Sequence, residues 1–157
     1  MTGFGRILED LNEAGVRYVL IGGIALIRHG VVRATRDLDA VFDPDPENVS
    51  RIESLVERWG ATRPDGSPLP EGSVSPERSV HLATAAGEVD LVSDRATGIA
   101  FGDLLARAEV KKVDGVEAPI CSLGDLVAMK RAVGRERDLV DLAELEAAHG
   151  ELPDLHE

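Results

Sequence analysis

Residues 18–42 read YVLIGGIALIRHGVVRATRDLDAVF, and this stretch decides the fold that the sequence predicts. The apolar run 18–21 contains one aromatic and two β-branched residues, which is typical of a short buried strand. Two glycines at 22–23 end this run, and residues 24–29 then predict a short helix that a third glycine ends. Residues 38–42 predict a second strand. The stretch therefore predicts a strand, a glycine turn, a short helix and a second strand.

Two aspartates mark the start of this second predicted strand. Asp37 and Asp39 are two residues apart, so on a strand both side chains project from the same face. Neighbouring carboxylates repel one another unless a cation lies between them, and hard divalent cations prefer oxygen ligands. Asp90, inside the apolar run 89–92, is the candidate for a third carboxylate. The pattern predicts a divalent metal site; the alternative is that all three are exposed acids of edge strands.

The glycine pair Gly22-Gly23 lies where the first predicted strand passes into the helix. A backbone without side chains can approach a triphosphate closely, and a helix N-terminus offers free N–H groups. The pair matches neither the Walker loop nor the dinucleotide-binding glycine pattern. A tight turn alone can also require two glycines. The pair therefore indicates phosphate binding only in combination with Asp37 and Asp39.

The rest of the chain predicts a single domain, residues 1–157, of the α+β or mixed α/β class. Further strands are predicted over 80–84, 88–93 and 110–121, and helices over 4–11, 47–59, 101–108, 123–132 and 135–149. Residues 61–79, rich in proline and glycine, predict a long loop. We therefore expect a small mixed sheet flanked by helices, with a C-terminal helical part over about 122–149.

The composition excludes several classes of protein. The 157 residues are 43% hydrophobic and 29% charged, which is typical of a globular chain and not of a disordered one. The net charge of −12 argues against binding of nucleic acid by bulk positive charge. No apolar run approaches the roughly 18 residues of a membrane helix, and the single Cys121 excludes an internal disulfide. We expect a cytoplasmic protein without a signal peptide or a membrane partner.

A basic cluster interrupts the acidic C-terminal part, since four of the eight residues that start at Lys130 are lysine or arginine. On a helix of about 100° per residue, Leu142 and Leu145 lie within about 40° of Asp138. Asp138 is therefore predicted to face the protein, with Asp141 at the rim. A buried carboxylate needs a partner, and Lys130 is the candidate. The pair is either a structural ion pair between two helices or a place where Lys130 meets a nucleotide phosphate.

Residues 18–42 resemble the signature of the nucleotidyltransferase superfamily, the DNA polymerase β-like fold, and above all its small bacterial branch of AbiEii-type toxins. That signature consists of an apolar strand, a glycine turn, a short helix, a basic and threonine lead-in such as 33–36, and Asp-x-Asp. The resemblance extends to residues 88–92 and 123–146. In this branch a third carboxylate lies on a later strand, and a lysine and an aspartate lie on consecutive C-terminal helices.

The resemblance implies roles for particular residues. It implies that Mg²⁺ is bound by three catalytic carboxylates, Asp37, Asp39 and Asp90. It implies that the nucleotide is bound by Gly22, Gly23, Arg36, Lys130 and Asp138. Many relatives have a serine or threonine in or directly after the glycine turn, whereas this chain has Ile24 there.

The activity that the resemblance implies is transfer of a nucleoside monophosphate from a nucleoside triphosphate, such as ATP, to an unknown acceptor. The acceptor would be an RNA end, a protein or a small molecule, over which the loop 61–79 could close. A toxin of this branch would have an antitoxin protein as its partner. Because Ile24 supplies no hydroxyl, a second interpretation stays open, namely a catalytically inactive nucleotide-binding or regulatory module of the same fold.

Overall fold

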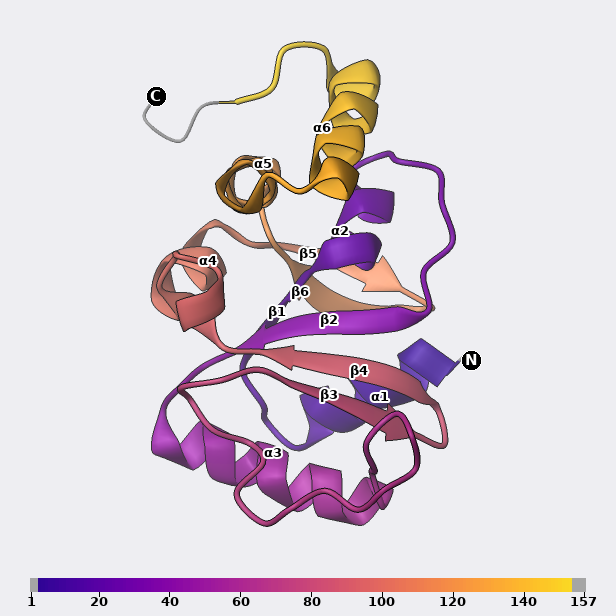
Figure 1. The fold of residues 1–157 in the computed structure, drawn as a ribbon, viewed down its shortest axis with the longest axis vertical. Helices are drawn as coiled ribbons and strands as arrows, with labels where there is room; N and C mark the ends of the chain where they lie inside the picture. Colours follow the sequence, from indigo (N-terminus) through magenta and orange to yellow (C-terminus); the bar gives the residue numbers. More distant parts are fainter. Residues whose placement is uncertain (1–2, 154–157) are drawn as a thin grey trace.

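The fold is seen in a computed structural model that describes residues 3–153 (Figure 1). In this range the strands are β1 (Tyr18–Ile21), β2 (Asp37–Phe42), β3 (Val80–Thr84), β4 (Gly87–Val92), β5 (Glu109–Val113) and β6 (Val116–Ile120). The helices are α1 (Gly3–Glu13), α2 (Gly22–Arg28), α3 (Pro46–Trp59), the short η1 (Asp94–Ala96), α4 (Phe101–Arg107), α5 (Leu123–Val133) and α6 (Glu136–His149). The predicted helices and strands are confirmed, except that α2 already begins at Gly22 and thus includes the glycine pair expected before it, and that η1 was not predicted.

The strands form one mixed sheet in the order β3-β4-β2-β1-β6-β5. β1 is antiparallel to β2 and parallel to β6, and β2 is parallel to β4. The two remaining pairings, β3 with β4 and β5 with β6, are antiparallel hairpins. The predicted mixed sheet flanked by helices is therefore confirmed.

Helices lie at both ends of the molecule with the sheet between them (Figure 1). At one end, α2 packs on β1, β2 and α5, and α5 packs against α6. At the opposite end lies α3, which contacts α1. No helix within residues 3–153 has the length and the apolar character needed to cross a lipid bilayer.

The amphipathic helices bury the faces that their sequence periods predict. In α1, the apolar residues Ile7, Leu8 and Leu11 are at most 1% exposed. In α3, Ile52 and Leu55 are equally buried. These side chains belong to one apolar core to which all six strands contribute, β5 only through Val113. This core fixes where the helices lie on the sheet.

The segment 61–79 between α3 and β3 contains neither a helix nor a strand, as predicted, but it is packed onto the sheet. Thr62 exchanges both backbone hydrogen bonds with Ala83, at 3.0 and 2.8 Å, along the outer edge of β3. Val74 is buried, and the hydroxyl of Ser93 donates to the carbonyl of Pro76 at 2.6 Å. The segment thus covers the edge strand and forms a wall beside it.

Candidate functional site

The glycine turn is built around the carboxylate of Asp39. β1 and β2 pair so that Ile21, the residue before the turn, lies opposite Asp39. Gly22 has φ +66°, and a Cβ atom there would overlap the carboxylate of Asp39. A Cβ atom on Gly23 would lie 2.6 Å from the hydroxyl of Thr35. Both glycines are therefore required because other groups of the site occupy the space of their missing side chains.

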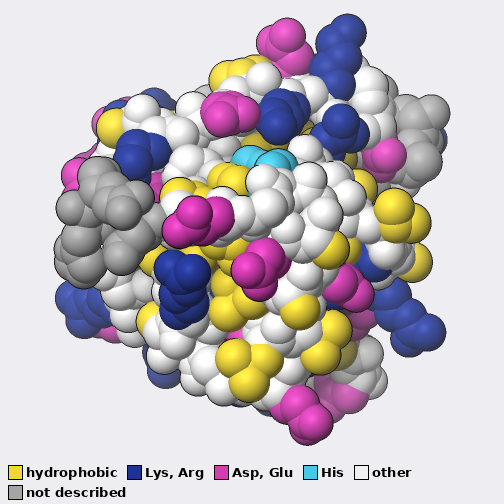
Figure 2. All heavy atoms as spheres, turned by 90° about the horizontal axis from the view of Figure 1, so that it is seen from above, with side chains coloured by type: hydrophobic (Ala, Val, Ile, Leu, Met, Phe, Trp, Pro, Cys, Tyr) yellow, Lys and Arg dark blue, Asp and Glu magenta, His cyan; other side chains and the backbone are white. Residues whose placement is uncertain are grey.

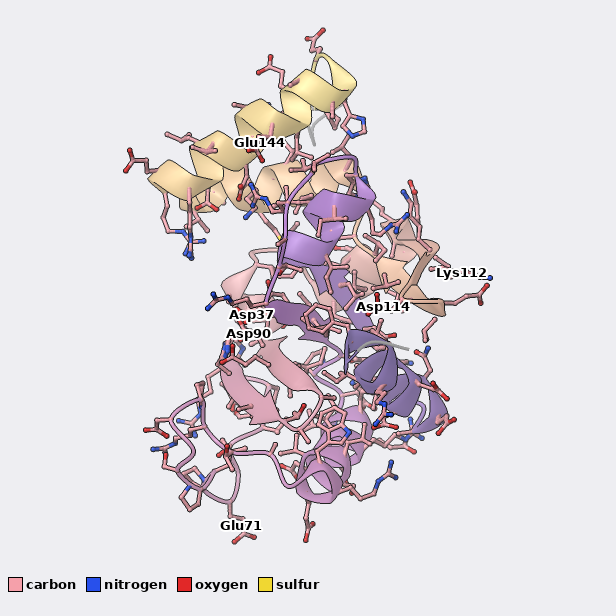
Figure 3. All side chains as sticks on the ribbon, turned by 90° about the vertical axis from the view of Figure 1, so that its right-hand side faces the viewer. Asp37, Glu71, Asp90, Lys112, Asp114 and Glu144 are labelled. Atoms are coloured by element: carbon pink, nitrogen blue, oxygen red, sulfur yellow. The ribbon has the colours of Figure 1, made fainter. Side chains whose placement is uncertain are left out.

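The three predicted carboxylates lie on one face of two neighbouring strands. In the parallel pairing of β2 and β4, Asp39 lies opposite Asp90, and Asp37 lies opposite Glu88. Figure 3 shows Asp37 and Asp90 next to each other on the side of the molecule over which α6 extends. The pairing, which the sequence did not reveal, thus brings Asp37, Asp39 and Asp90 together as expected.

The electrostatics of these carboxylates are those of an uncompensated negative cluster. Burial first, and then the charges of Asp90 and Asp37, together raise the pKa of Asp39 from 3.8 to about 6, against opposing effects of His81 and Lys130. Burial also raises the pKa of Asp90, as does Asp37. Within residues 3–153, none of the three carboxylates forms an ion pair with a basic side chain. Unpaired oxygen donors of this kind fit a hard divalent cation.

Two further residues beside Asp37 had not been expected at the site. Asp37, His81 and Glu88 each offer a potential metal-ligand atom, and these atoms lie within 4.8 Å of one another. Nε2 of His81 is 3.4 Å from a carboxylate oxygen of Glu88. No sequence motif marks either residue as a ligand. The period-two pattern of the hairpin could have indicated them, because His81 lies opposite Asp90 and Glu88 precedes Asp90 by two positions.

The carboxylates open into a cleft of 440 Å³ between the sheet and the C-terminal helices. The predicted site residues that line it are Gly22, Gly23, Asp37, Asp39, Asp90, Lys130 and Asp138. Arg36 is exposed and is not among the lining residues, whereas Arg33 is. The structure therefore gathers the predicted residues around one space with the exception of Arg36, and it adds Arg33.

An ion network closes the helical side of the cleft. Nζ of Lys130 lies 3.3 Å from Asp138 and 2.9 Å from Asp141. Arg33 reaches Asp141 at 2.6 Å and Glu144 at 2.7 Å. Asp141 was expected at the rim, but it is only 5% exposed, because Lys130 and Arg33 each bind one of its oxygens. The network links α5, α6 and the segment before β2, and it holds Lys130 toward the cleft.

Asp138 also fixes the start of α6. Its carboxylate accepts hydrogen bonds from the backbone N–H of Arg135 at 3.1 Å and from Nε of the same residue at 2.8 Å. The hydrogen bond from the Arg135 side chain holds the pKa of Asp138 at about 2, below its ordinary value of 3.8. Asp138, the third residue of α6, therefore forms a capping box with the N-cap residue Arg135 and is also a partner of Lys130.

We expect Asp138→Asn to lower the free energy of unfolding at pH 7 by about 1–2 kcal/mol, with screening by water at the half-exposed Arg135 taken into account. Because the folded pKa is depressed, the contribution of the carboxylate is complete above pH 4 and is lost as the pH falls toward 2. Urea titrations of both proteins between pH 7 and pH 2.5 measure this effect. A stability difference that does not shrink on acidification would contradict the depressed pKa.

No protein-family model and no curated protein sequence matches this chain. Similar folds occur among solved structures. The lincosamide antibiotic adenylyltransferase LnuA, solved with lincomycin, is 16% identical with a TM-score of 0.59, over 93% of this chain and 96% of that one. ANT(2'')-Ia in complex with adenylyl-2''-tobramycin is 14% identical with a TM-score of 0.62, over 94% and 87%. TM1012 from Thermotoga maritima is 18% identical with a TM-score of 0.58, over 88% and 87%.

Proposed function

Since this chain has the fold of the nucleotidyltransferases, we propose that it transfers a nucleoside monophosphate from a nucleoside triphosphate to the hydroxyl group of an acceptor. The observation that carries the proposal is the cluster of Asp37, Asp39 and Asp90, which face a cleft without a basic partner among residues 3–153. A fold alone hosts many functions, so the proposed activity rests on these carboxylates and not on the fold.

The three carboxylates would hold Mg²⁺. When bound, such an ion stabilises the charge on the attacking and leaving oxygens of an in-line phosphoryl displacement. The residues fit this role because they supply oxygen donors from adjacent strands and because burial makes their unneutralised charge costly. A raised pKa, as found for Asp39, is expected of a metal-binding carboxylate when no cation neutralises its charge.

The triphosphate would lie between the glycine turn and the C-terminal helices. Gly22 and Gly23 present backbone to the cleft, and Lys130 and Arg33 supply positive charge from its other wall. Ile24, the residue that replaces a hydroxyl in this chain, is buried in the core. A hydroxyl is nevertheless present at the turn, since Thr35 lies beside Gly23 and donates to the carbonyl of Asp37 at 3.1 Å. In this proposal Asp138 and Asp141 orient Lys130 toward phosphate.

An RNA acceptor is disfavoured because the basic side chains on the α5 and α6 face are separated by acidic and apolar ones (Figure 2). LnuA is an adenylyltransferase of a lincosamide antibiotic, which favours a small-molecule acceptor here as well. The toxin role and the antitoxin partner rest on the resemblance of residues 18–42, 88–92 and 123–146.

We expect the protein to bind ATP or another nucleoside triphosphate in the presence of Mg²⁺ and to lose this binding in EDTA. Asp37→Asn should weaken Mg²⁺-dependent binding at least about tenfold, because one anionic ligand is lost. Titration calorimetry with each nucleotide, and transfer of α-³²P label to a mixture of acceptors, measure the two steps. Binding without transfer in every mixture would leave the inactive module of the same fold, and absence of binding would exclude both functions.

A further inference from the structure

The geometry of the proposed reaction places the acceptor on a particular side of the carboxylates, and this step rests on the proposed function. In phosphoryl transfer, the attacking and leaving oxygens lie roughly in line on opposite sides of the phosphorus. Across the sheet the order is Gly22 after β1, Asp39 on β2, Asp90 on β4 and His81 on β3. With the triphosphate on the side of β1 and α5, the acceptor must approach from the side of β4 and β3.

A second cleft, of 610 Å³, lies on that side. It is formed between the segment 61–79 and β3, and its walls include Arg63, Leu69, Ser73, Arg78, Ser79 and His81. Pockets for small molecules are typically about 300–1,000 Å³. The segment 61–79 is held against the edge of β3 by the backbone pairing of Thr62 with Ala83, so the cleft has a built wall.

His81 connects this cleft to the carboxylates. Its side chain lines the cleft, and on the sheet it lies opposite Asp90. One of its ring nitrogens is within 4.8 Å of a carboxylate oxygen of Asp37, and Glu88 holds the ring at 3.4 Å. An acceptor in this cleft would therefore meet His81 at the end that is nearest to the carboxylates.

The charges in the cleft indicate what kind of acceptor it would take. Arg63 and Arg78 form no ion pair within residues 3–153. Two acidic residues, Asp65 and Glu71, also line the cleft. The carboxylate of Asp65 already accepts hydrogen bonds from the N–H and the hydroxyl of Ser67, at 2.9 and 2.6 Å. Glu71 points away from the molecule (Figure 3). Two free guanidinium groups thus remain, and guanidinium groups pair with carboxylate or phosphate.

We propose that the cleft between the segment 61–79 and β3 is the acceptor subsite, and that it takes a small hydroxylated molecule that carries a carboxylate or a phosphate. Arg63 and Arg78 bind the anionic group, and His81 hydrogen-bonds the hydroxyl. The hydroxyl oxygen forms a bond to the α-phosphorus and its proton is released to solvent. The bond from that phosphorus to the bridging oxygen breaks, and pyrophosphate leaves with the electron pair. RNA is disfavoured because aromatic residues for base stacking make up only 3% of the chain.

The test uses the full chain with Mg²⁺, α-³²P-labelled nucleoside triphosphate and four sets of acceptors. The sets are hydroxy acids (gluconate, glycerate), phosphates (glucose 6-phosphate, glycerol 3-phosphate), the polycation tobramycin, and an RNA oligonucleotide with a free 3′ hydroxyl. We expect labelled product in the hydroxy-acid set, the phosphate set or both. The kcat/KM for that acceptor should fall at least about tenfold in the double variant Arg63→Ala/Arg78→Ala and in His81→Gln.

Three controls separate this proposal from the proposed function. Arg58→Ala removes an exposed arginine of α3 outside both clefts, and it should leave transfer unchanged. Calorimetry should give the same nucleotide affinity in all variants, and circular dichroism the same melting temperature in the arginine variants. The proposed acceptor subsite would be overturned if product formed only with tobramycin or RNA, or if neither anionic set gave product. It would also be overturned if transfer to an anionic acceptor were unchanged in the variants. Absence of nucleotide binding in the unmodified protein would overturn the proposed function instead.

Discussion

Asp39→Asn is expected to lower nucleotidyl transfer by on the order of 10³-fold or more and, in the absence of metal, to raise the melting temperature at pH 7. The loss of activity follows because Asp39 lies next to Asp37 and opposite Asp90 and has no ion-pair partner within residues 3–153, so its charge is free for the proposed cation. The gain in stability follows because burial, and after it repulsion by Asp90 and Asp37, disfavours the ionised carboxylate in the folded protein. An amide of the same shape removes that repulsion.

The pH dependence gives the sign of this effect. The pKa of Asp39 in the folded protein is raised to about 6, so above that pH the folded carboxylate is ionised and the full cost of its charge is present. As the pH falls from 6 toward 4, the folded carboxylate takes up a proton and the cost disappears. The stabilisation by Asp39→Asn should therefore be largest at pH 7 and vanish near pH 4. Thermal melts of both proteins in EDTA measure it, and a variant that is less stable than the parent at pH 7 would disprove the repulsion.

Gly22→Ala is expected to lower transfer by on the order of 10²-fold and the free energy of unfolding by about 2 kcal/mol. A non-glycine residue at φ +66° is strained, and its Cβ atom would displace the carboxylate of Asp39 from its place beside the turn. The displaced carboxylate can no longer bind a cation together with Asp90. Steady-state kinetics and urea unfolding measure the two effects.

Gly60→Ala is the matched control for this variant. Gly60 has φ +60° at the end of α3, and among residues 3–153 no atom beyond its own chain neighbours lies within 4 Å of the place that its Cβ would take. The backbone strain is thus nearly the same as at Gly22, but no site residue is displaced. We expect Gly60→Ala to lose stability by about 1 kcal/mol and to keep full activity. Equal losses of activity in both variants would show that general strain, and not the position of Asp39, accounts for the result.

Local elements could be predicted because their causes are local. Apolar spacing placed α1 and α3, and glycines such as Gly60 and Gly134 ended their helices, since both adopt the left-handed conformation after the last turn. The carboxylates Asp37 and Asp39 could be predicted to share a face because a strand alternates its side chains at every second residue. These features need no knowledge of what packs against them.

The remaining features depend on pairings between distant segments. Nothing in the sequence around His81 indicates a role. It lies beside Asp37 because β3 pairs with β4 and β4 pairs with β2. Asp141 was expected to be partly exposed because the helical period does not reveal that Arg33, more than a hundred residues earlier, binds it. The wall formed by residues 61–79 likewise follows from an edge pairing that composition does not specify.

The short segment before β2 carries an additional consequence. Arg33, Thr35 and Asp37 are alternate residues, and they reach three different parts of the molecule: α6, the glycine turn and the cleft. The spacing between these residues determines whether all three side chains reach their contacts together. Inserting or deleting one residue here would put all three out of step at once, whereas a substitution affects one at a time. In the divergence of such chains, the length of this segment should therefore be kept more strictly than its composition.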